Sequence, residues 1–283
     1  MSSRMWALSK SFLFSPGRAA KDCTDDKNLA PCFWIYAAFT LGTMLFFALK
    51  PFDFPDQNAP YPREAQTLMF WFKVMLWQPP LEAAWIAFLL GLVVWFRRGS
   101  LPVRLTSAVA WTAVPFILMA VYAAAGKPGA GCSHLDMAAI PPACYEPLAR
   151  AAREIRLAKW AMLLGAAVWI GLFVPLWRRL ARTEVVPAIT FMLGVNAVGV
   201  AMLAPMILAT SLRSKGFFMA SQAAGGFWIL GCATLGLRQL TGLRLPRAFM
   251  AVLLSMFFQI ALAFTLHLLG LVPKDILKAL LYA

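Results

Sequence analysis

Residues 81–125, LEAAWIAFLLGLVVWFRRGSLPVRLTSAVAWTAVPFILMAVYAAA, decide the fold of this chain. One apolar run ends at Phe96, a short turn with three arginines follows, and a second apolar run begins at Leu105. Two apolar segments joined by a short cationic turn are typical of paired transmembrane helices, because cationic residues stay on the cytoplasmic side of the membrane. The stretch predicts a helical hairpin whose turn is cytoplasmic.

The composition of the whole chain agrees with a membrane protein. Of its 283 residues, 61% are hydrophobic and 13% are charged, whereas soluble domains are about 45–50% apolar. The net charge is +14, but the arginines stand singly or in twos and threes between apolar runs. A nucleic-acid groove would need a basic stripe interleaved with aromatic residues. We therefore expect these cations to face the headgroups of the lipid bilayer, and we expect no nucleic-acid partner.

Seven apolar segments are predicted to span the membrane as an all-α helical bundle, at about 31–49, 81–96, 105–125, 159–177, 185–212, 217–237 and 248–272. With a cytoplasmic N-terminus, the short cytoplasmic turns contain the arginines Arg97, Arg98, Arg104, Arg178, Arg179, Arg182, Arg238, Arg244 and Arg247. The short turn on the other side contains Arg213 and Lys215. This bias predicts that the N-terminus is cytoplasmic, in a bacterial-type inner membrane.

The chain is predicted to have three parts. Residues 1–30 form a cytoplasmic segment, residues 31–212 a five-span bundle with two outside segments, and residues 213–283 two additional spans. In the first outside segment, residues 64–77 are too few to cross a core of about 30 Å at about 1.5 Å per residue, and Pro79 and Pro80 follow. We predict an interfacial helix there, with a re-entrant half-helix as the alternative.

A second interfacial helix is predicted at residues 146–158. Its arginines recur every third position, which places them on one stripe of a helix.

Few polar residues are expected inside the spans. Glu82 falls at the end of its predicted span, so no ionisable group is expected near the middle of any span. Pumps and proton-coupled carriers usually need such groups. The remaining polar candidates are Asn196, Gln222, Gln259 and His267. Contacts between helices, worth about 0.6–2 kcal/mol each, are the preferred interpretation, and solute ligands are the alternative.

The second outside segment contains Cys132 and Cys144, which are candidates for a disulfide worth about 3 kcal/mol in an oxidising compartment. Together with His134 and Asp136 they form an alternative metal set, but this spacing is not that of a structural zinc site. No nucleophile has a base and an oxyanion hole nearby in the sequence. We therefore expect no catalytic site, no metal and no cofactor.

Two stretches suggest a family. Residues 12–20, FLFSPGRAA, place a short apolar piece, a proline and a basic residue before the first span, and residues 110–115 read AWTAVP. Over about residues 10–210 the chain resembles bacterial Yip-domain (Ypt-interacting protein) membrane proteins. It departs from them in having only Gly99 where the turn usually has paired glycines, and in having two further spans. The resemblance implies a helical membrane protein without catalysis that acts through protein partners.

Two functions are compatible with these features. The preferred hypothesis is a non-catalytic scaffold or accessory subunit whose helices pack against another membrane protein subunit or a second copy of the chain. The alternative is a transporter or channel subunit for an apolar or uncharged solute, with residues 64–96 lining the path.

Overall fold

A computed structural model describes residues 2–49, 67–111, 160, 163, 165 and 167–282 of the chain. Helices and turns make up this described part, which contains no strand. The helices are α1 (Ser2–Phe14), α2 (Pro16–Asp22), the 3-10 helix η1 (Asp26–Asn28), α3 (Leu29–Leu49), α4 (Leu68–Phe96), α7 (Arg182–Ser211), α8 (Lys215–Thr241), α9 (Leu245–Leu268) and α10 (Lys274–Tyr282). Residues 101–111 and Ala167–Trp177 are also helical. The all-α prediction is confirmed for these residues.

Five of the described helices are long and apolar enough to cross a membrane, which indicates an integral, multi-pass membrane protein. They are Asp26–Leu49, Leu68–Phe96, Arg182–Ser211, Lys215–Thr241 and Leu245–His267. The predicted spans at 31–49, 185–212, 217–237 and 248–272 coincide with α3, α7, α8 and α9. The predicted span at 159–177 is helical at the described residues 160, 163, 165 and 167–177. The predicted span at 105–125 falls largely outside the described residues, and Cys132, Cys144 and residues 146–158 lie outside them.

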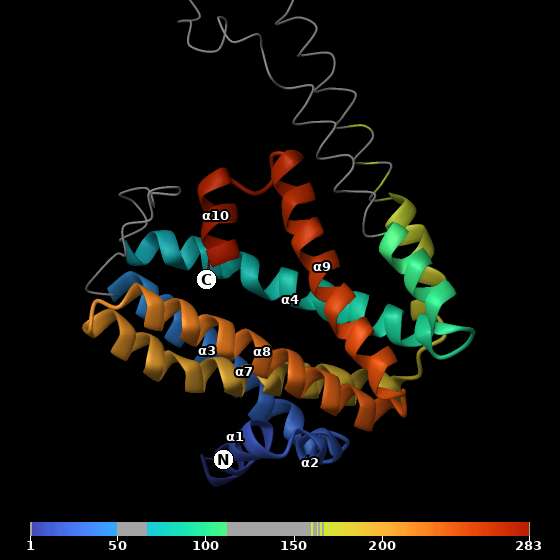
Figure 1. The fold of residues 1–283 in the computed structure, drawn as a ribbon, viewed down its shortest axis with the longest axis horizontal. Helices are drawn as coiled ribbons and strands as arrows, with labels where there is room; N and C mark the ends of the chain where they lie inside the picture. The colour runs from blue at the N-terminus through green and yellow to red at the C-terminus, as the bar shows by residue number, and fades with distance from the viewer. Residues whose placement is uncertain are drawn as a thin grey trace, which may run out of the picture.

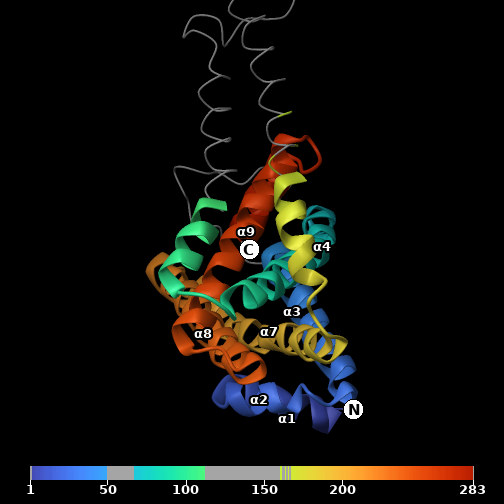
Figure 2. The same ribbon diagram turned by 90° about the vertical axis from the view of Figure 1, so that its right-hand side faces the viewer.

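The helices are arranged in two layers with the N-terminal segment on one side (Figure 1). Helices α3, α7 and α8 lie side by side, with α7 in contact with both neighbours. Helix α4 crosses this layer and packs against α3 and α9. Figure 2 shows α1 and α2 beneath α7 and α8, on the side opposite α9. The N-terminal segment therefore packs against the flank of the bundle.

Helix α4 is continuous from Leu68 to Phe96, which corrects the prediction of a separate interfacial helix before a span that begins at residue 81. Pro79 and Pro80 lie inside the helix and donate no backbone hydrogen bond, but the chain stays helical on both sides of them. Prolines are tolerated in membrane helices because neighbouring helices and local adjustments compensate for the freed carbonyls. At about 1.5 Å per residue, the 29 residues of α4 extend about 43 Å. Glu82 is thus in the middle of the helix and not at an end.

Phe12 of α1 anchors the N-terminal segment to the bundle. Its ring is fully buried and lies 5.3 Å from the ring of Phe191 in α7. Gly194 makes room for it, since a Cβ at that position would overlap the Phe12 ring. On the other side, the Phe12 carbonyl accepts a hydrogen bond from the Cys232 thiol of α8 at 3.4 Å. The stretch 12–20 that resembles the Yip-domain signature is therefore docked between α7 and α8.

A cluster of aromatic rings joins α4, α9 and the helix Ala167–Trp177. The Phe88 ring lies 5.1 Å from both Phe173 and Phe258. Gly91 leaves space for the Phe173 ring. Trp177 donates its indole N–H to the Ala87 carbonyl at 2.7 Å. Aromatic pairs at such distances add about 0.5–1.5 kcal/mol each beyond the area they bury.

Two glycines of α8 provide a matched test of the packing. A Cβ on Gly236 would overlap the buried ring of Phe191, whereas a Cβ on Gly231 would meet no described atom within 4 Å. We expect Gly236→Ala to destabilise the protein by about 1–3 kcal/mol through overpacking. Gly231→Ala should leave stability unchanged or raise it by up to about 1 kcal/mol, because alanine favours the helix. Thermal unfolding in detergent measures both, and equal effects would contradict the arrangement of α7 and α8.

Candidate functional site

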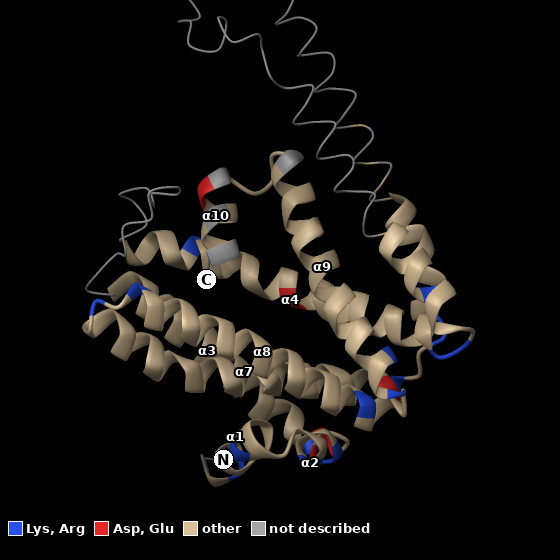
Figure 3. Ribbon diagram, in the orientation of Figure 1, with Lys and Arg blue, Asp and Glu red and all other residues tan. Residues whose placement is uncertain are grey.

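The arginines predicted to set the topology gather at one end of the bundle, where α4 ends and α7 and α9 begin (Figure 3). Arg97 pairs with Glu184 near the start of α7. Arg247 of α9 donates to the carbonyls of Phe96 and Gly99 at 2.8 Å each. The last carbonyls of a helix lack partners within the helix, so Arg247 satisfies orphan acceptors of α4. The turn between α7 and α8 lies at the opposite end of these helices.

The third arginine of the hairpin turn stacks on an aromatic ring. The guanidinium of Arg104 lies 3.9 Å from the ring centre of Trp95, and the Trp95 indole N–H donates to the Arg104 carbonyl at 3.0 Å. This fixes the turn against the end of α4. The other predicted arginines are exposed, namely Arg98, Arg178, Arg179, Arg182, Arg238 and Arg244.

The polar residues predicted inside the spans are engaged mostly with backbone. Asn196 of α7 donates to the carbonyls of its own helix at residues 192 and 193, at 3.2 Å each. Gln259 of α9 donates to the Leu81 carbonyl of α4 at 3.3 Å, and His267 contacts the Val272 carbonyl at 2.7 Å through Nδ1. Gln222 also has an interaction partner. The four side chains are spread over α7, α8 and α9 and do not form one cluster.

Glu82, which the sequence analysis placed at the end of a span, is the most unusual polar group of the bundle. Its side chain is only 5% exposed, and its Oε1 atom makes no hydrogen bond within the described chain. No described cation pairs with it. Two polar side chains from other helices lie near it, Tyr36 of α3 and Asn196 of α7, and the Asn196 amide also donates to its own helix. Three helices therefore enclose one acidic group in the middle of α4, and a buried ionisable group in a membrane helix is usually functional.

One sequence signal could have located this site. The apolar stretch 68–96 contains one acidic residue, and it is the central one if the prolines are counted as part of the helix. Because Pro79 and Pro80 were expected to end a helix, Glu82 was predicted to lie near the membrane surface.

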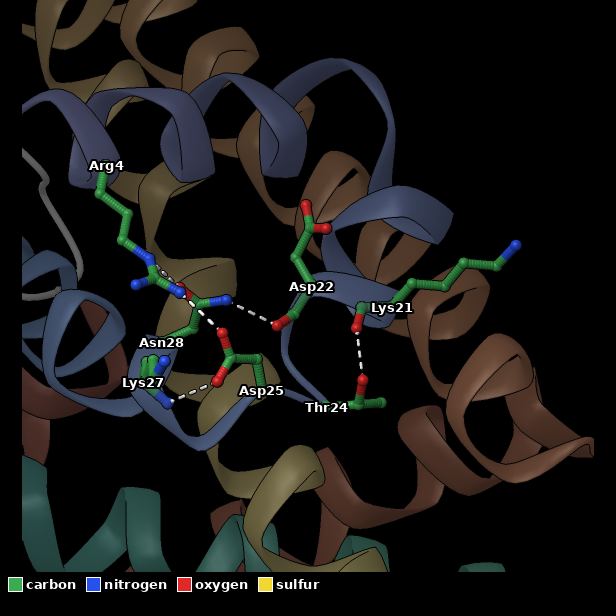
Figure 4. A network of polar contacts seen from close by, with 7 residues as sticks. All are labelled: Arg4, Lys21, Asp22, Thr24, Asp25, Lys27 and Asn28. Atoms are coloured by element: carbon green, nitrogen blue, oxygen red, sulfur yellow. Dashed lines mark hydrogen bonds and ion pairs between the residues drawn. The ribbon is translucent and has the colours of Figure 1, made fainter.

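A second polar cluster fixes the N-terminal segment (Figure 4). Arg4 of α1 donates to Asp25 at 2.8 Å and to the side-chain oxygen of Asn28 at 2.7 Å. Asn28 in turn donates to the Asp22 carbonyl at 2.6 Å. The backbone N–H of Lys27, and then Arg4, hold the pKa of Asp25 below its usual value. The cluster ties α1 to the turn that begins α3.

The described cysteines are buried and free. Cys23 and Cys32 lie together, and the contact with Cys32, followed by burial, raises the pKa of the Cys23 thiol. A thiol held in its neutral form is a poor nucleophile. No group of three or more His, Cys, Asp or Glu side chains that could hold a metal ion occurs among the described residues. The predicted disulfide and the alternative metal set, at residues 132–144, lie outside them.

Comparisons with protein-family models, with curated proteins and with solved structures find no match to this chain. The resemblance to Yip-domain proteins therefore stays a prediction, and the function has to be argued from the chain's own residues.

The Arg4–Asp25 contact yields a test of the N-terminal cluster. We expect Arg4→Ala to speed amide hydrogen exchange in α1. Lys10→Ala should leave it nearly unchanged, because the ammonium group of Lys10 lies 5.2 Å from the ring of Trp6 in its own helix. Because the pKa of Asp25 is lower in the folded than in the unfolded protein, its carboxylate stabilises the fold at pH values above the unfolded pKa. This stabilisation is lost as the pH falls through the folded pKa. The protection of the α1 amides, measured relative to the intrinsic exchange rate at each pH, should therefore fall in acid more in the wild type than in Arg4→Ala. Equal acid sensitivity of the two proteins would contradict the assignment.

Proposed function

We propose that the protein is a non-catalytic scaffold or accessory subunit of a membrane protein complex, and that α8 docks a helix of another subunit or of a second copy. The observation that carries this proposal is the presence on α8 of glycines that have no close neighbour in the described part of the molecule.

The glycines of α8 fall into two classes. Gly225 and Gly236 face neighbouring helices, where a Cβ would lie 3.0 Å from Met202 or overlap Phe191. At Gly216, Gly226 and Gly231, no described atom lies within 4 Å of the place of a Cβ. Glycine is about 1 kcal/mol less favourable than alanine inside a helix. The outward glycines therefore fit a close approach from outside, as small residues do between membrane helices.

Neighbouring residues extend the same surface of α8. Ala220, Ala223 and Ala224 are exposed small residues, and Met219 and Phe227 are exposed large ones, with Phe227 75% exposed. Small residues let two helix backbones approach, and larger apolar side chains fill the space beside the contact.

The surface ends in an apolar hollow of about 360 Å³ between α8 and the start of α9. The Thr234 hydroxyl is buried and makes no hydrogen bond within the described chain. The hollow is lined by Gly231, Thr234, Leu235, Leu245, Pro246 and Phe249. A side chain of a docked helix would fill it.

The polar side chains that a solute carrier would use support the same proposal. Asn196, Gln259 and His267 all bond to backbone carbonyls, so their hydrogen-bonding groups are engaged in holding helices and turns. A transporter or channel subunit is the second candidate, and it is favoured by one observation, the buried carboxyl group of Glu82.

We further propose that the protein lies in a bacterial-type inner membrane with a cytoplasmic N-terminus and seven spans. The gathering of arginines where α4 ends and α7 and α9 begin supports this orientation, because cations mark the cytoplasmic side.

Gly226→Leu tests docking on α8. A Cβ at this exposed position meets no atom of the described chain within 4 Å, so the variant should purify as a folded monodisperse protein. It should lose the partner that co-purifies with the wild type in mild detergent, by about tenfold or more, since overpacking costs about 1–3 kcal/mol.

Gly171→Leu is the matched control. Gly171 is an exposed glycine without described neighbours on the helix Ala167–Trp177, so this variant should retain the partner. Retention of the partner by Gly226→Leu would contradict the proposal. Solute flux through the purified protein alone, in reconstituted vesicles, would favour the transporter.

A further inference from the structure

A row of hydroxyl groups runs along one stripe of α3. Tyr36, Thr40 and Thr43 are spaced by four and three residues, which places them on the same face of a helix. The oxygen atoms of all three are shielded, and none makes a hydrogen bond of normal geometry within the described chain, although Tyr36 and Thr40 lie close to each other. From the first to the last, the row covers about 10 Å at about 1.5 Å per residue.

Several other helical threonines behave differently, although the buried hydroxyl of Thr234 in α8 also makes no hydrogen bond within the described chain. Thr190, Thr210 and Thr265 each donate to a carbonyl of their own helix, at 2.9, 2.8 and 2.8 Å. That local bond is the usual solution for a threonine in an apolar helix. An unmade hydrogen bond leaves a buried polar atom at a cost of about 1–3 kcal/mol. The three hydroxyl groups of α3 therefore lower the stability of the fold. They are free to form hydrogen bonds with another group.

The group next to this row is the carboxyl group of Glu82. Glu82 lies near enough to Tyr36 to act on its phenol group electrostatically, and Thr40 lies one helical turn from Tyr36 on the same face of α3. Of the helices packed against α4, α3 brings Tyr36 as the titratable neighbour and α7 brings the uncharged amide of Asn196. Helix α9 brings the uncharged Ser255, which accepts from Trp85 at 2.8 Å, and Gln259, which donates to the Leu81 carbonyl. No cation among the described residues compensates a charge on Glu82.

We propose that Glu82 is a proton-binding site inside the bundle and that the hydroxyl row of Tyr36, Thr40 and Thr43 serves it. A carboxylate buried without a cation costs several kcal/mol, whereas the neutral acid does not carry that penalty. The resting site therefore holds the acid.

The hydroxyls make ionisation feasible. When the acid O–H bond breaks, the proton passes to water and the carboxylate keeps the electron pair. A carboxylate accepts several hydrogen bonds, and a hydroxyl group donates one and accepts others. The idle hydroxyl of Tyr36 can turn to Glu82 as a donor, and those of Thr40 and Thr43 can accept and pass on a proton along α3. This inference goes beyond the proposed function, because docking a partner on α8 requires no ionisable group.

Infrared spectroscopy of the full-length protein in lipid vesicles tests the proposal. With glutamate labelled by carbon-13 at the side-chain carboxyl, we expect an isotope-shifted band of a protonated acid at neutral pH that disappears as the pH is raised. Glu82→Gln should lack this band. Glu184→Gln should retain it, because Glu184 is half-exposed and paired with Arg97.

Exchange into heavy water tests the hydroxyl row. The Glu82 band should shift several-fold more slowly in the double variant with Thr40→Val and Thr43→Val than in the wild type. Thr190→Val, which removes a hydroxyl bonded to its own helix, should exchange at the wild-type rate. Exchange at the wild-type rate in the double variant would overturn the role of the row.

Three results would overturn the proton site itself. They are a wild type without a labelled acid band at neutral pH, a neutral-pH band that persists in Glu82→Gln, and a band abolished by sodium ions at constant pH. The first and third need only the wild-type protein, so the proposal is testable even if Glu82→Gln fails to fold. The loss or retention of the partner in Gly226→Leu tests docking on α8 and has no bearing on the proton site at Glu82.

Discussion

A carboxyl group buried in the middle of α4 constrains the helices around it. Removing an acidic group from water without a cation is unfavourable unless the group is neutral or receives hydrogen bonds. Helices α3 and α7 approach α4 at this level and supply Tyr36 and Asn196. Elsewhere several polar side chains are satisfied locally, as Thr190 and Thr265 show by bonding to their own helices. The centre of α4 is thus the place where a buried ionisable group and the contacts between helices coincide.

The end of the same helix is surrounded by cations, whereas its middle contains an acidic group with no described cation beside it. Arg97 ties it to Glu184 of α7, and Arg247 of α9 binds the carbonyls at its last turn. Cations near a helix C-terminus are also favoured by the helix dipole. One set of arginines therefore joins three helices and produces the charge bias from which the membrane orientation was predicted. Orientation and helix capping depend on the same side chains.

The sequence predicted most of the helices, because α3, α7, α8 and α9 are long apolar runs bounded by cations or turns. It failed at α4, where two prolines suggested an end. In a membrane the flanking apolar backbone gains nothing by leaving the helix, so the helix continues through Pro79 and Pro80. The packing of Phe12 against Gly194 could not be predicted, because the space for the ring is provided by a helix far away in the sequence. The site at Glu82 was missed as a consequence of the error in α4, and its neighbours come from two other helices. Three of the four predicted polar residues, Asn196, Gln259 and His267, bond to backbone carbonyls.

The depth of Glu82 in the membrane is the most direct test of this account. Spin labels placed one at a time on cysteines at positions 74–90, in a background without the five native cysteines, report depth by their relative exposure to oxygen and to a water-soluble relaxation agent. A continuous α4 predicts a helical periodicity that runs through positions 79 and 80, with the greatest depth around position 82. A loss of periodicity at the prolines, with position 82 at the depth of the headgroups, would contradict the account.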